Sequence, residues 1–133
     1  MKLKFINVSV TDQEAALAVY TTKFGFKKMA DITMGHYRWL TVTSPDGING
    51  VELVLQPLYP PAEAHQKMLF DAGIPATAFI TEDIALEVQR LKAAGVTVRG
   101  EPQVMGPITA VMIEDGCGNL INLVQPHQQN PES

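Results

Sequence analysis

The sequence predicts an α+β fold made of two tandem βαβββ modules, and three observations lead to this prediction. An alternating run followed by an amphipathic helical segment, at 5–25, recurs about 70 residues later at 76–95. Three more strand-like runs follow each helical segment. A chain of 133 residues is long enough for one domain, or for two small halves that share a core. Because a module of this size cannot bury its sheet alone, we expect the two modules to pack together.

The first module is expected at about residues 2–57. The run "FINVSVTD" (5–12) alternates apolar and polar residues, which is typical of a half-buried strand. In "TDQE", Thr11 is expected to cap the following helix, with Glu14 reaching back to it. Gly25 stands where a left-handed residue would end that helix. The helix presents one apolar stripe, which consists of Ala16, Leu17, Tyr20 and Phe24.

Three further strands are expected in the first module, and a linker follows them. The strand-like runs cover about 27–34, 36–44 and 50–56, and the turns between them contain Gly35 and "SPDGING". After this module, "YPPAEAHQKMLFDAGIP" predicts a helix at about 60–73, because proline is favoured in a first helical turn.

The second module is expected at about residues 75–126. It opens with the alternating run 76–83 and a helix that ends at Gly95. Strand-like runs then cover about 96–104, 108–114 and 119–125. The remaining residues, 127–133, read as a polar tail.

Composition excludes several classes of function. A formal net charge of −4 with scattered basic residues argues against nucleic-acid binding, which needs clustered Lys and Arg. No run approaches the roughly 20 apolar residues of a membrane span, and the start of the chain does not read as a signal peptide. The single cysteine, Cys117, excludes an internal disulfide. We therefore expect a cytoplasmic protein without nucleic-acid or membrane partners.

Three segments resemble the vicinal oxygen chelate (VOC) superfamily, which includes glyoxalase I, bleomycin resistance proteins and extradiol dioxygenases. They are "VTDQEAALAVYTTKFGF", "FITEDIALEVQRLKAAGV" and "DGCGNLINLVQ", and together they extend the resemblance over about residues 2–126 as a single domain. The resemblance implies a cup-shaped mixed sheet and a homodimer. It does not identify a reaction, because this fold serves many.

The resemblance also implies where a metal ion would be bound. In metal-dependent members, each module supplies one ligand from its first strand and one from its last. These positions fall on Phe5 and Glu52 in the first module, and on Ala76 and Asn122 in the second. Only Glu52 is a competent ligand, whereas a catalytic divalent site keeps about three protein ligands. We therefore expect no metal cofactor.

The same positions outline a pocket for a small molecule. If Glu52 points into the cup, an apolar environment is expected to raise its pKa, so that it could serve as a general base. The alternative is a leftover ligand position that hydrogen-bonds to a neighbour such as Asn7 or Asn122. In "HYRWLTV", Tyr37 and Trp39 are expected to line the cup and offer flat contact area.

The histidines and the cysteine are weaker candidates. His36, His65 and His127 occupy none of the ligand positions that the resemblance implies. Cys117 lies in the turn "DGCGN", close to two acidic residues that would oppose a thiolate. It is therefore interpreted as structural.

Two functions remain open from the sequence. One is metal-independent binding of a small organic ligand, similar to the drug-sequestering resistance proteins. The other is a glyoxalase-like or dioxygenase-like enzyme that uses Glu52 as a base or builds a non-standard metal site. The sequence leaves open whether any reaction is catalysed.

Overall fold

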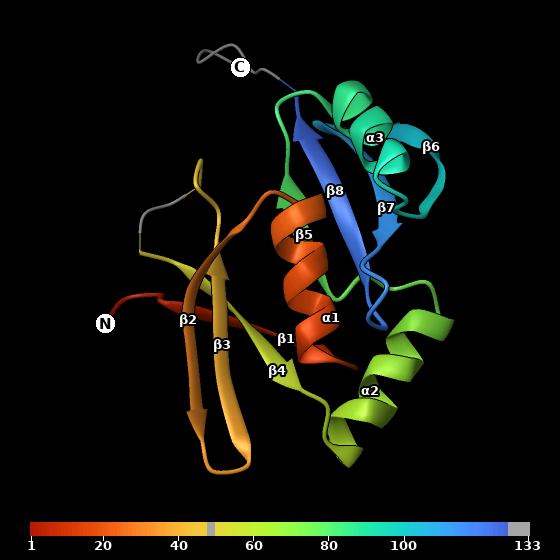
Figure 1. The fold of residues 1–133 in the computed structure, drawn as a ribbon. Helices are drawn as coiled ribbons and strands as arrows, with labels where there is room; N and C mark the ends of the chain where they lie inside the picture. Colours follow the sequence, from red (N-terminus) through yellow and green to blue (C-terminus); the bar gives the residue numbers. More distant parts are fainter. Residues whose placement is uncertain (48–49, 128–133) are drawn as a thin grey trace.

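The structure, a computed structural model, describes residues 1–47 and 50–127 (Figure 1). The expected polar tail therefore lies, from residue 128 onward, outside the described residues. The regular elements occur in this order: β1 (Phe5–Val10), α1 (Gln13–Ala18), a π-helical turn (Val19–Lys23), β2 (Lys27–Met34), β3 (Tyr37–Thr43), β4 (Glu52–Pro57), α2 (Pro60–Asp71), β5 (Thr77–Ile80), α3 (Ile84–Ala93), β6 (Val98–Met105), β7 (Ile108–Glu114) and β8 (Leu120–Pro126).

The strands form two four-stranded sheets with the same topology. The first sheet has the order β1-β4-β3-β2, and the second has the order β5-β8-β7-β6. In each sheet the first and last strands of the module pair in parallel, and the other neighbours pair antiparallel. The predicted βαβββ repeat and the α+β fold class are confirmed.

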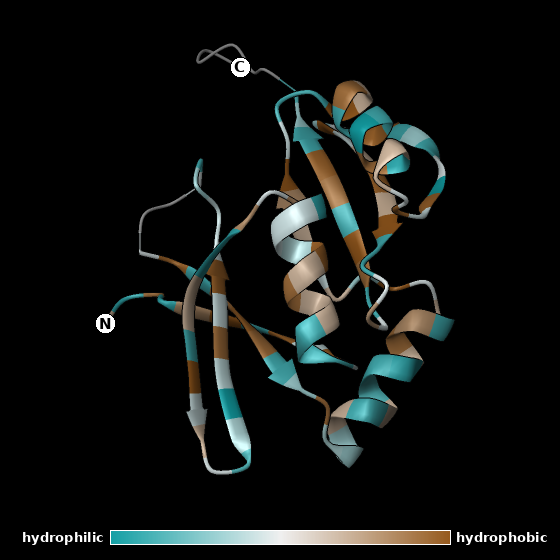
Figure 2. Ribbon diagram, in the orientation of Figure 1, coloured by the Kyte–Doolittle hydropathy of each residue, from teal (hydrophilic) through white to brown (hydrophobic). Residues whose placement is uncertain are grey.

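Each sheet buries one face against its own helix. Alternation along the strands directs Val8, Val10, Leu40 and Leu55 to a core with Ala16 of α1 and Tyr20 of the π-helical turn. The second sheet packs in the same way on α3, through Ile84, Val88, Leu91, Val111, Ile113, Ile121 and Leu123. Brown and teal residues alternate along several strands in Figure 2, as expected for sheets with one buried face.

The two modules meet through these helix-facing sides. Phe24 and Phe79 pack against both cores, and their ring centroids lie 6.0 Å apart. Cys117 of the second module is buried within the core of the first. Figure 1 shows α1 between the two sheets. The opposite face of each sheet, which we call its open face, therefore points away from the shared interior.

The turn "DGCGN" is held by the carboxylate of Asp115, which is only 1% exposed. One carboxylate oxygen accepts hydrogen bonds from the backbone N–H groups of Cys117 (2.7 Å) and Asn119 (3.0 Å). The other accepts from the Tyr20 hydroxyl at 2.7 Å and from the Asn119 side chain at 2.9 Å. A buried carboxylate needs such partners, so this turn is fixed to the first module.

The linker helix α2 is attached to the same turn through one side chain. The amide nitrogen of Gln66 donates to the carbonyl oxygens of Ser9 at 2.8 Å and Cys117 at 3.2 Å. Gly118, at a φ of +95°, lies directly beneath this amide, and a Cβ atom there would come within 2.6 Å of it. Gln66 thus connects the linker to both modules.

The predicted caps are partly confirmed. Gly25 and Gly95 adopt positive φ values of 80° and 87°, as expected for residues that follow a helix. The predicted cap at Thr11 is wrong. Asp12 is the N-cap, and its carboxylate accepts from the backbone N–H of Ala15 at 3.0 Å, since a carboxylate also interacts favourably with the positive end of the helix.

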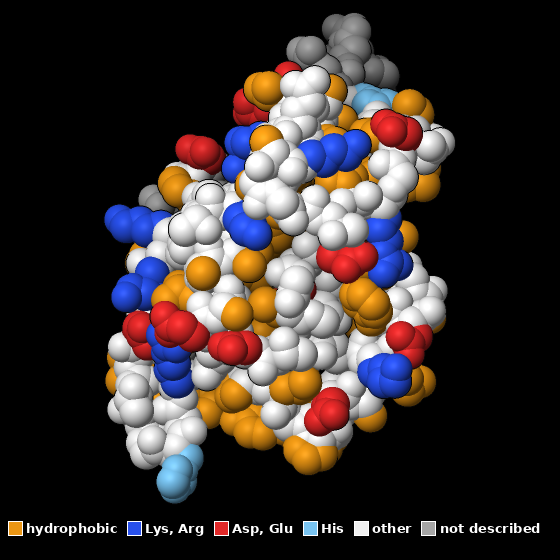
Figure 3. Space-filling model, turned by 45° about the vertical axis from the view of Figure 1, so that its right-hand side comes forward, with side chains coloured by type: hydrophobic (Ala, Val, Ile, Leu, Met, Phe, Trp, Pro, Cys, Tyr) orange, Lys and Arg blue, Asp and Glu red, His pale blue; other side chains and the backbone are white. Residues whose placement is uncertain are grey.

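The described residues include no helix that is both long and apolar enough to cross a membrane. On the face shown in Figure 3, basic and acidic side chains are interspersed with hydrophobic ones, and neither sign of charge forms a large patch.

Candidate functional site

The open face of the first sheet carries an aromatic pair. Phe5 of β1 and Trp39 of β3 meet edge to face, with ring centroids 5.2 Å apart and planes at 81°. Phe5 is 46% exposed, although it is large and apolar. Tyr37 and Asn7 lie two residues along the same strands, so they share this face. These four residues therefore share one face of the sheet, and their role in lining a ligand pocket stays a prediction.

Glu52 of β4 lies beside this pair and is nearly enclosed. It is opposite Phe5 in the parallel register, and it is 9% exposed. One carboxylate oxygen accepts a hydrogen bond from the hydroxyl of Thr41 at 2.6 Å. The other lies 2.8 Å from the ammonium of Lys4. Both oxygens therefore have partners within the first module.

This environment lowers the pKa of Glu52. The hydrogen bond from Lys4 is the main cause, followed by the one from Thr41, and both outweigh the effect of burial. The expectation of a raised pKa is wrong, because the Lys4 ammonium beside Glu52 outweighs the effect of the apolar surroundings. A carboxylate with a lowered pKa is a weak proton acceptor at neutral pH, so the geometry does not favour Glu52 as a general base.

Two of the predicted pocket residues belong to the second module: Asn122 lies in β8, and Ala76 directly precedes β5. Asn122 lies on the open face of that sheet, in register with Ala78 and Met112. Since Glu52 is in register with Phe5, the residue that corresponds to Phe5 is Ala78 and not Ala76. Within one chain, these residues are on a different open face from Phe5, Trp39 and Glu52.

The donor atoms at the four family ligand positions are few. Phe5 and Ala78 have no donor, and the oxygens of Glu52 are engaged by Lys4 and Thr41. Within residues 1–47 and 50–127, no group of three His, Cys, Asp or Glu side chains is arranged to hold a metal ion. The residues at the family's position therefore do not fit a divalent ion.

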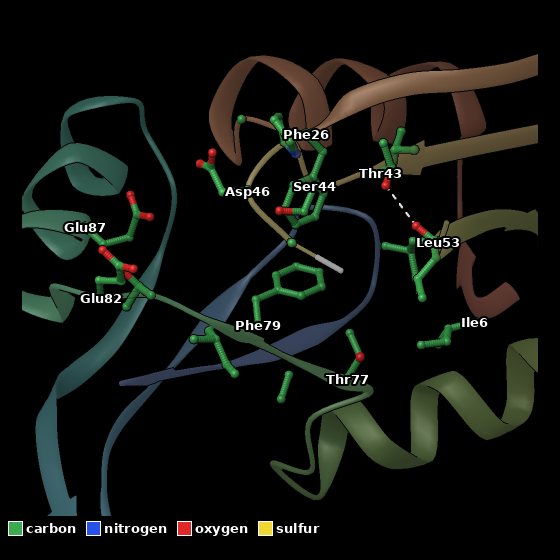
Figure 4. A pocket seen from close by; sticks show the side chains of 18 of the residues that line it. Ile6, Phe26, Thr43, Ser44, Asp46, Leu53, Thr77, Phe79, Glu82 and Glu87 are labelled. Atoms are coloured by element: carbon green, nitrogen blue, oxygen red, sulfur yellow. Dashed lines mark hydrogen bonds between the residues drawn. The ribbon is translucent and has the colours of Figure 1, made fainter. Parts of the chain in front are cut away.

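A cleft that the sequence did not predict lies between the modules (Figure 4). This cleft has a volume of about 1250 Å³. Its apolar lining includes Ile6, Phe26, Leu53 and Phe79, and the acidic side chains of Glu82 and Glu87 lie toward one end. No local pattern indicates such a cleft, because its walls come from both modules and from the loop after β3.

Cys117 is structural, as interpreted from the sequence. It is 1% exposed, and burial together with Asp115 raises the pKa of its thiol to about 11. The thiol is therefore protonated and inaccessible at neutral pH. His127 contacts Thr109, with 2.6 Å between the ring nitrogen and the hydroxyl oxygen, at the far end of the second sheet.

Comparison with known proteins places the chain among related sequences. The family described as "Glyoxalase/Bleomycin resistance protein/Dioxygenase superfamily" matches residues 2–123. The Bacillus subtilis protein YurT, described as uncharacterized, is 47% identical over 94% of this chain and 99% of its own length. A second B. subtilis protein, YetH, also described as uncharacterized, is 35% identical over 89% of this chain and 92% of its own.

Two solved structures share the fold over nearly the whole chain. UcmS2 superposes with a TM-score of 0.80 at 31% identity, covering 93% of this chain and 97% of its own. TnmS3, described as an antibiotic binding protein from Streptomyces sp. CB03234, has a TM-score of 0.76 at 29% identity, covering 95% of this chain and 96% of its own. With its repeated βαβββ modules and this family match, the chain belongs to the glyoxalase/bleomycin resistance protein/dioxygenase superfamily.

Proposed function

We propose that this protein binds a small, flat organic ligand on the open face of the first sheet without breaking a bond in it. The observation that carries the proposal is the arrangement of Phe5, Trp39 and Glu52. The two rings offer partly exposed aromatic surface. The carboxylate beside them pairs with the Lys4 ammonium and accepts a hydrogen bond from Thr41, and its lowered pKa makes it poorly suited to accept a proton. Such a face is suited to aromatic contact with a ligand and not to acid–base chemistry.

The description of TnmS3 supports the binding function. It is an antibiotic binding protein with the same fold at 29% identity. That a protein of this architecture binds an antibiotic supports a small organic molecule as the ligand. The comparison adds weight to a binding role here, and it does not specify the ligand.

We further propose that a second copy of the chain completes the site. The open faces carry exposed apolar side chains, among them Ile32 (52%) and Met34 (53%) on the first and Ile80 (74%) on the second. One open sheet is not a closed pocket, whereas ligand sites bury most of the ligand surface. If the first open face of one copy covers the second open face of another, a two-fold axis creates two equivalent pockets. Asn122 and Ala78 would then approach Phe5 and Trp39 from the partner.

Trp39 gives a direct test of the binding function, because it is the single tryptophan of the chain. Flat aromatic compounds and antibiotics are titrated into the purified protein while Trp39 emission is followed. Quenching that saturates and that is lost in Phe5→Ala supports the proposal. As a control, Phe70→Ala changes a phenylalanine on α2 that lies against Arg99, remote from the aromatic pair.

The enzyme hypothesis predicts a different result for one variant. If Glu52 were a catalytic base, Glu52→Gln would abolish turnover and leave binding intact. If the wild-type protein turns over a bound compound and Glu52→Gln does not, the binding proposal is overturned and the enzyme hypothesis is supported.

A further inference from the structure

We propose that Lys4 selects ligands that combine an aromatic ring with an anionic oxygen group, such as a carboxylate, a sulfonate or a phenolate. This inference rests on the proposed binding function and adds the charge of the ligand to it. The sequence did not indicate Lys4, because it precedes the first strand and matches no ligand position.

The contacts of the Lys4 ammonium leave it able to bind a further acceptor. An ammonium has three N–H donors. One is directed to Glu52 at 2.8 Å, and the group lies 5.6 Å from the centre of the Phe5 ring. The Lys4 side chain is 47% exposed, whereas that of Glu52 is 12% exposed. The cation is therefore the accessible member of the pair, and it lies at the edge of the aromatic surface.

Glu52 acts as a support for this cation. Thr41 donates to one of its oxygens, which fixes the carboxylate in one orientation. The fixed carboxylate in turn holds the Lys4 chain over the open face, so less conformational freedom is lost when a ligand binds. Because the ion pair is partly exposed, the attraction between Glu52 and Lys4 is weak, and an anionic ligand can compete for the ammonium.

The remaining charges of the first module strengthen this preference. Glu14 and Asp31 are both bound by Arg38, on the helix-facing side. Lys27 is in register with Thr43, which lies two residues beyond Thr41 on the open side of β3. Lys4 and Lys27 thus share the open side of the sheet with the carboxylate of Glu52. These two cations and one carboxylate together contribute a formal charge of +1 on the open side, which favours an anionic ligand.

Geometry couples this charge to the rings. A ring that lies against Phe5 and Trp39 has its edge close to Glu52, since Phe5 and Glu52 are opposite each other in the register. An anionic oxygen on that edge would meet the Lys4 ammonium and make a charge-assisted hydrogen bond. The same ring without the oxygen would keep only the aromatic contacts.

Two fluorescent probes separate these contributions. 1-Anilinonaphthalene-8-sulfonate and N-phenyl-1-naphthylamine share one ring system and differ by the sulfonate. Each is titrated into the purified full chain, with probe emission and Trp39 quenching as readouts. For Lys4→Met, we expect the Kd of the sulfonate probe to rise about tenfold, which is the usual size of one charge-assisted contact. The Kd of the neutral probe should change less than about twofold.

Two further variants complete the experiment. Lys67→Met makes the same chemical change on α2, where the lysine pairs with Asp71, and should leave both probes unaffected. Glu52→Gln keeps an oxygen that can accept from Lys4, so part of the support remains, and it removes the negative charge that repels an anionic ligand. The sulfonate probe should therefore bind at least about threefold more tightly. Thermal melts of all variants confirm that each is folded.

The outcomes separate this inference from the function on which it rests. If neither probe saturates or quenches Trp39, the binding function itself is overturned, and the inference with it. If both probes bind but Lys4→Met changes them equally or not at all, only the role of Lys4 is overturned. Weaker binding of the sulfonate probe to Glu52→Gln would also contradict the inference.

Discussion

The hydroxyl of Tyr20 donates a 2.7 Å hydrogen bond to Asp115, and this buried contact joins the two modules. Tyr20 belongs to the first module, and Asp115 holds the last turn of the second. Burial and the neighbouring carboxylate raise the pKa of Tyr20 well above 10.0, so the phenol remains a donor. The relative position of the two modules depends on this bond and on the aromatic residues around it.

Replacing Tyr20 by Phe should destabilise the protein by about 1–3 kcal/mol, because Asp115 would lose a partner while remaining buried. Urea unfolding at fixed protein concentration measures the change. Tyr59→Phe, at a position that is 51% exposed, is the matched control and should shift the free energy of unfolding by less than about 0.5 kcal/mol. Equal effects of the two changes would show that the buried bond is unimportant.

Gly118→Ala should destabilise more than Gly106→Ala. Both glycines have a positive φ, but only at Gly118 does a new Cβ meet another group, the amide of Gln66 at 2.6 Å. The backbone cost common to both is about 1–2 kcal/mol, and displacement of Gln66 adds to it at Gly118. In a Gln66→Ala background the difference between the two should shrink. A difference that persists there would exclude the steric explanation.

Cys117 should react with a thiol reagent only when the protein opens. It is 1% exposed and its pKa is about 11, so the reactive thiolate is scarce at pH 8 and shielded. Labelling with Ellman's reagent should be complete within minutes in urea and slower by orders of magnitude in native buffer. Rapid labelling of the native protein would contradict the buried position.

The Glu52 ion pair should make stability depend on acid pH. The folded pKa of Glu52 lies below its ordinary value of 4.5. The unfolded chain therefore takes up a proton first as pH falls, and the stabilisation present above about pH 4.5 is lost as pH drops through the folded pKa. Glu52→Gln should show a shallower loss between pH 6 and 3 in urea titrations. Parallel curves for wild type and variant would show that Lys4 does not stabilise the ionised form.

The proposed second copy should be visible in solution. Light scattering during size-exclusion chromatography is expected to give twice the monomer mass of 14.5 kDa. Ile32→Glu places a charge on an apolar position of the first open face and should shift the mass toward the monomer. Ile74→Glu, on the exposed linker after α2, is the control. A wild-type monomer at micromolar concentration would rule out the two-copy pocket.

The fold was predictable to a large extent because its signals are local. Alternation identified the strand β1 and the runs that became β2 to β4, and glycines marked the helix ends at Gly25 and Gly95. The repeat indicated that both modules have the same order of elements. It also indicated that they pack together, since each needs the other to bury a core. The cap was placed one residue early, because Thr11 and Asp12 both carry oxygens that can cap a helix and only backbone geometry decides between them.

By itself, the sequence determined the two modules, the aromatic residues Phe5 and Trp39, and the loss of ligand types at the family's metal positions. Only the tertiary structure decided which groups meet. It paired Asn122 with Ala78, placed Lys4 against Glu52, and turned the two open faces away from each other. Periodicity fixes the face on which a side chain lies. The charged groups that surround it depend on strand register and on segments without periodicity, such as the residues before β1. Lys4 lies in that segment, and for this reason the pKa of Glu52 is lowered, whereas the sequence suggested that it would be raised.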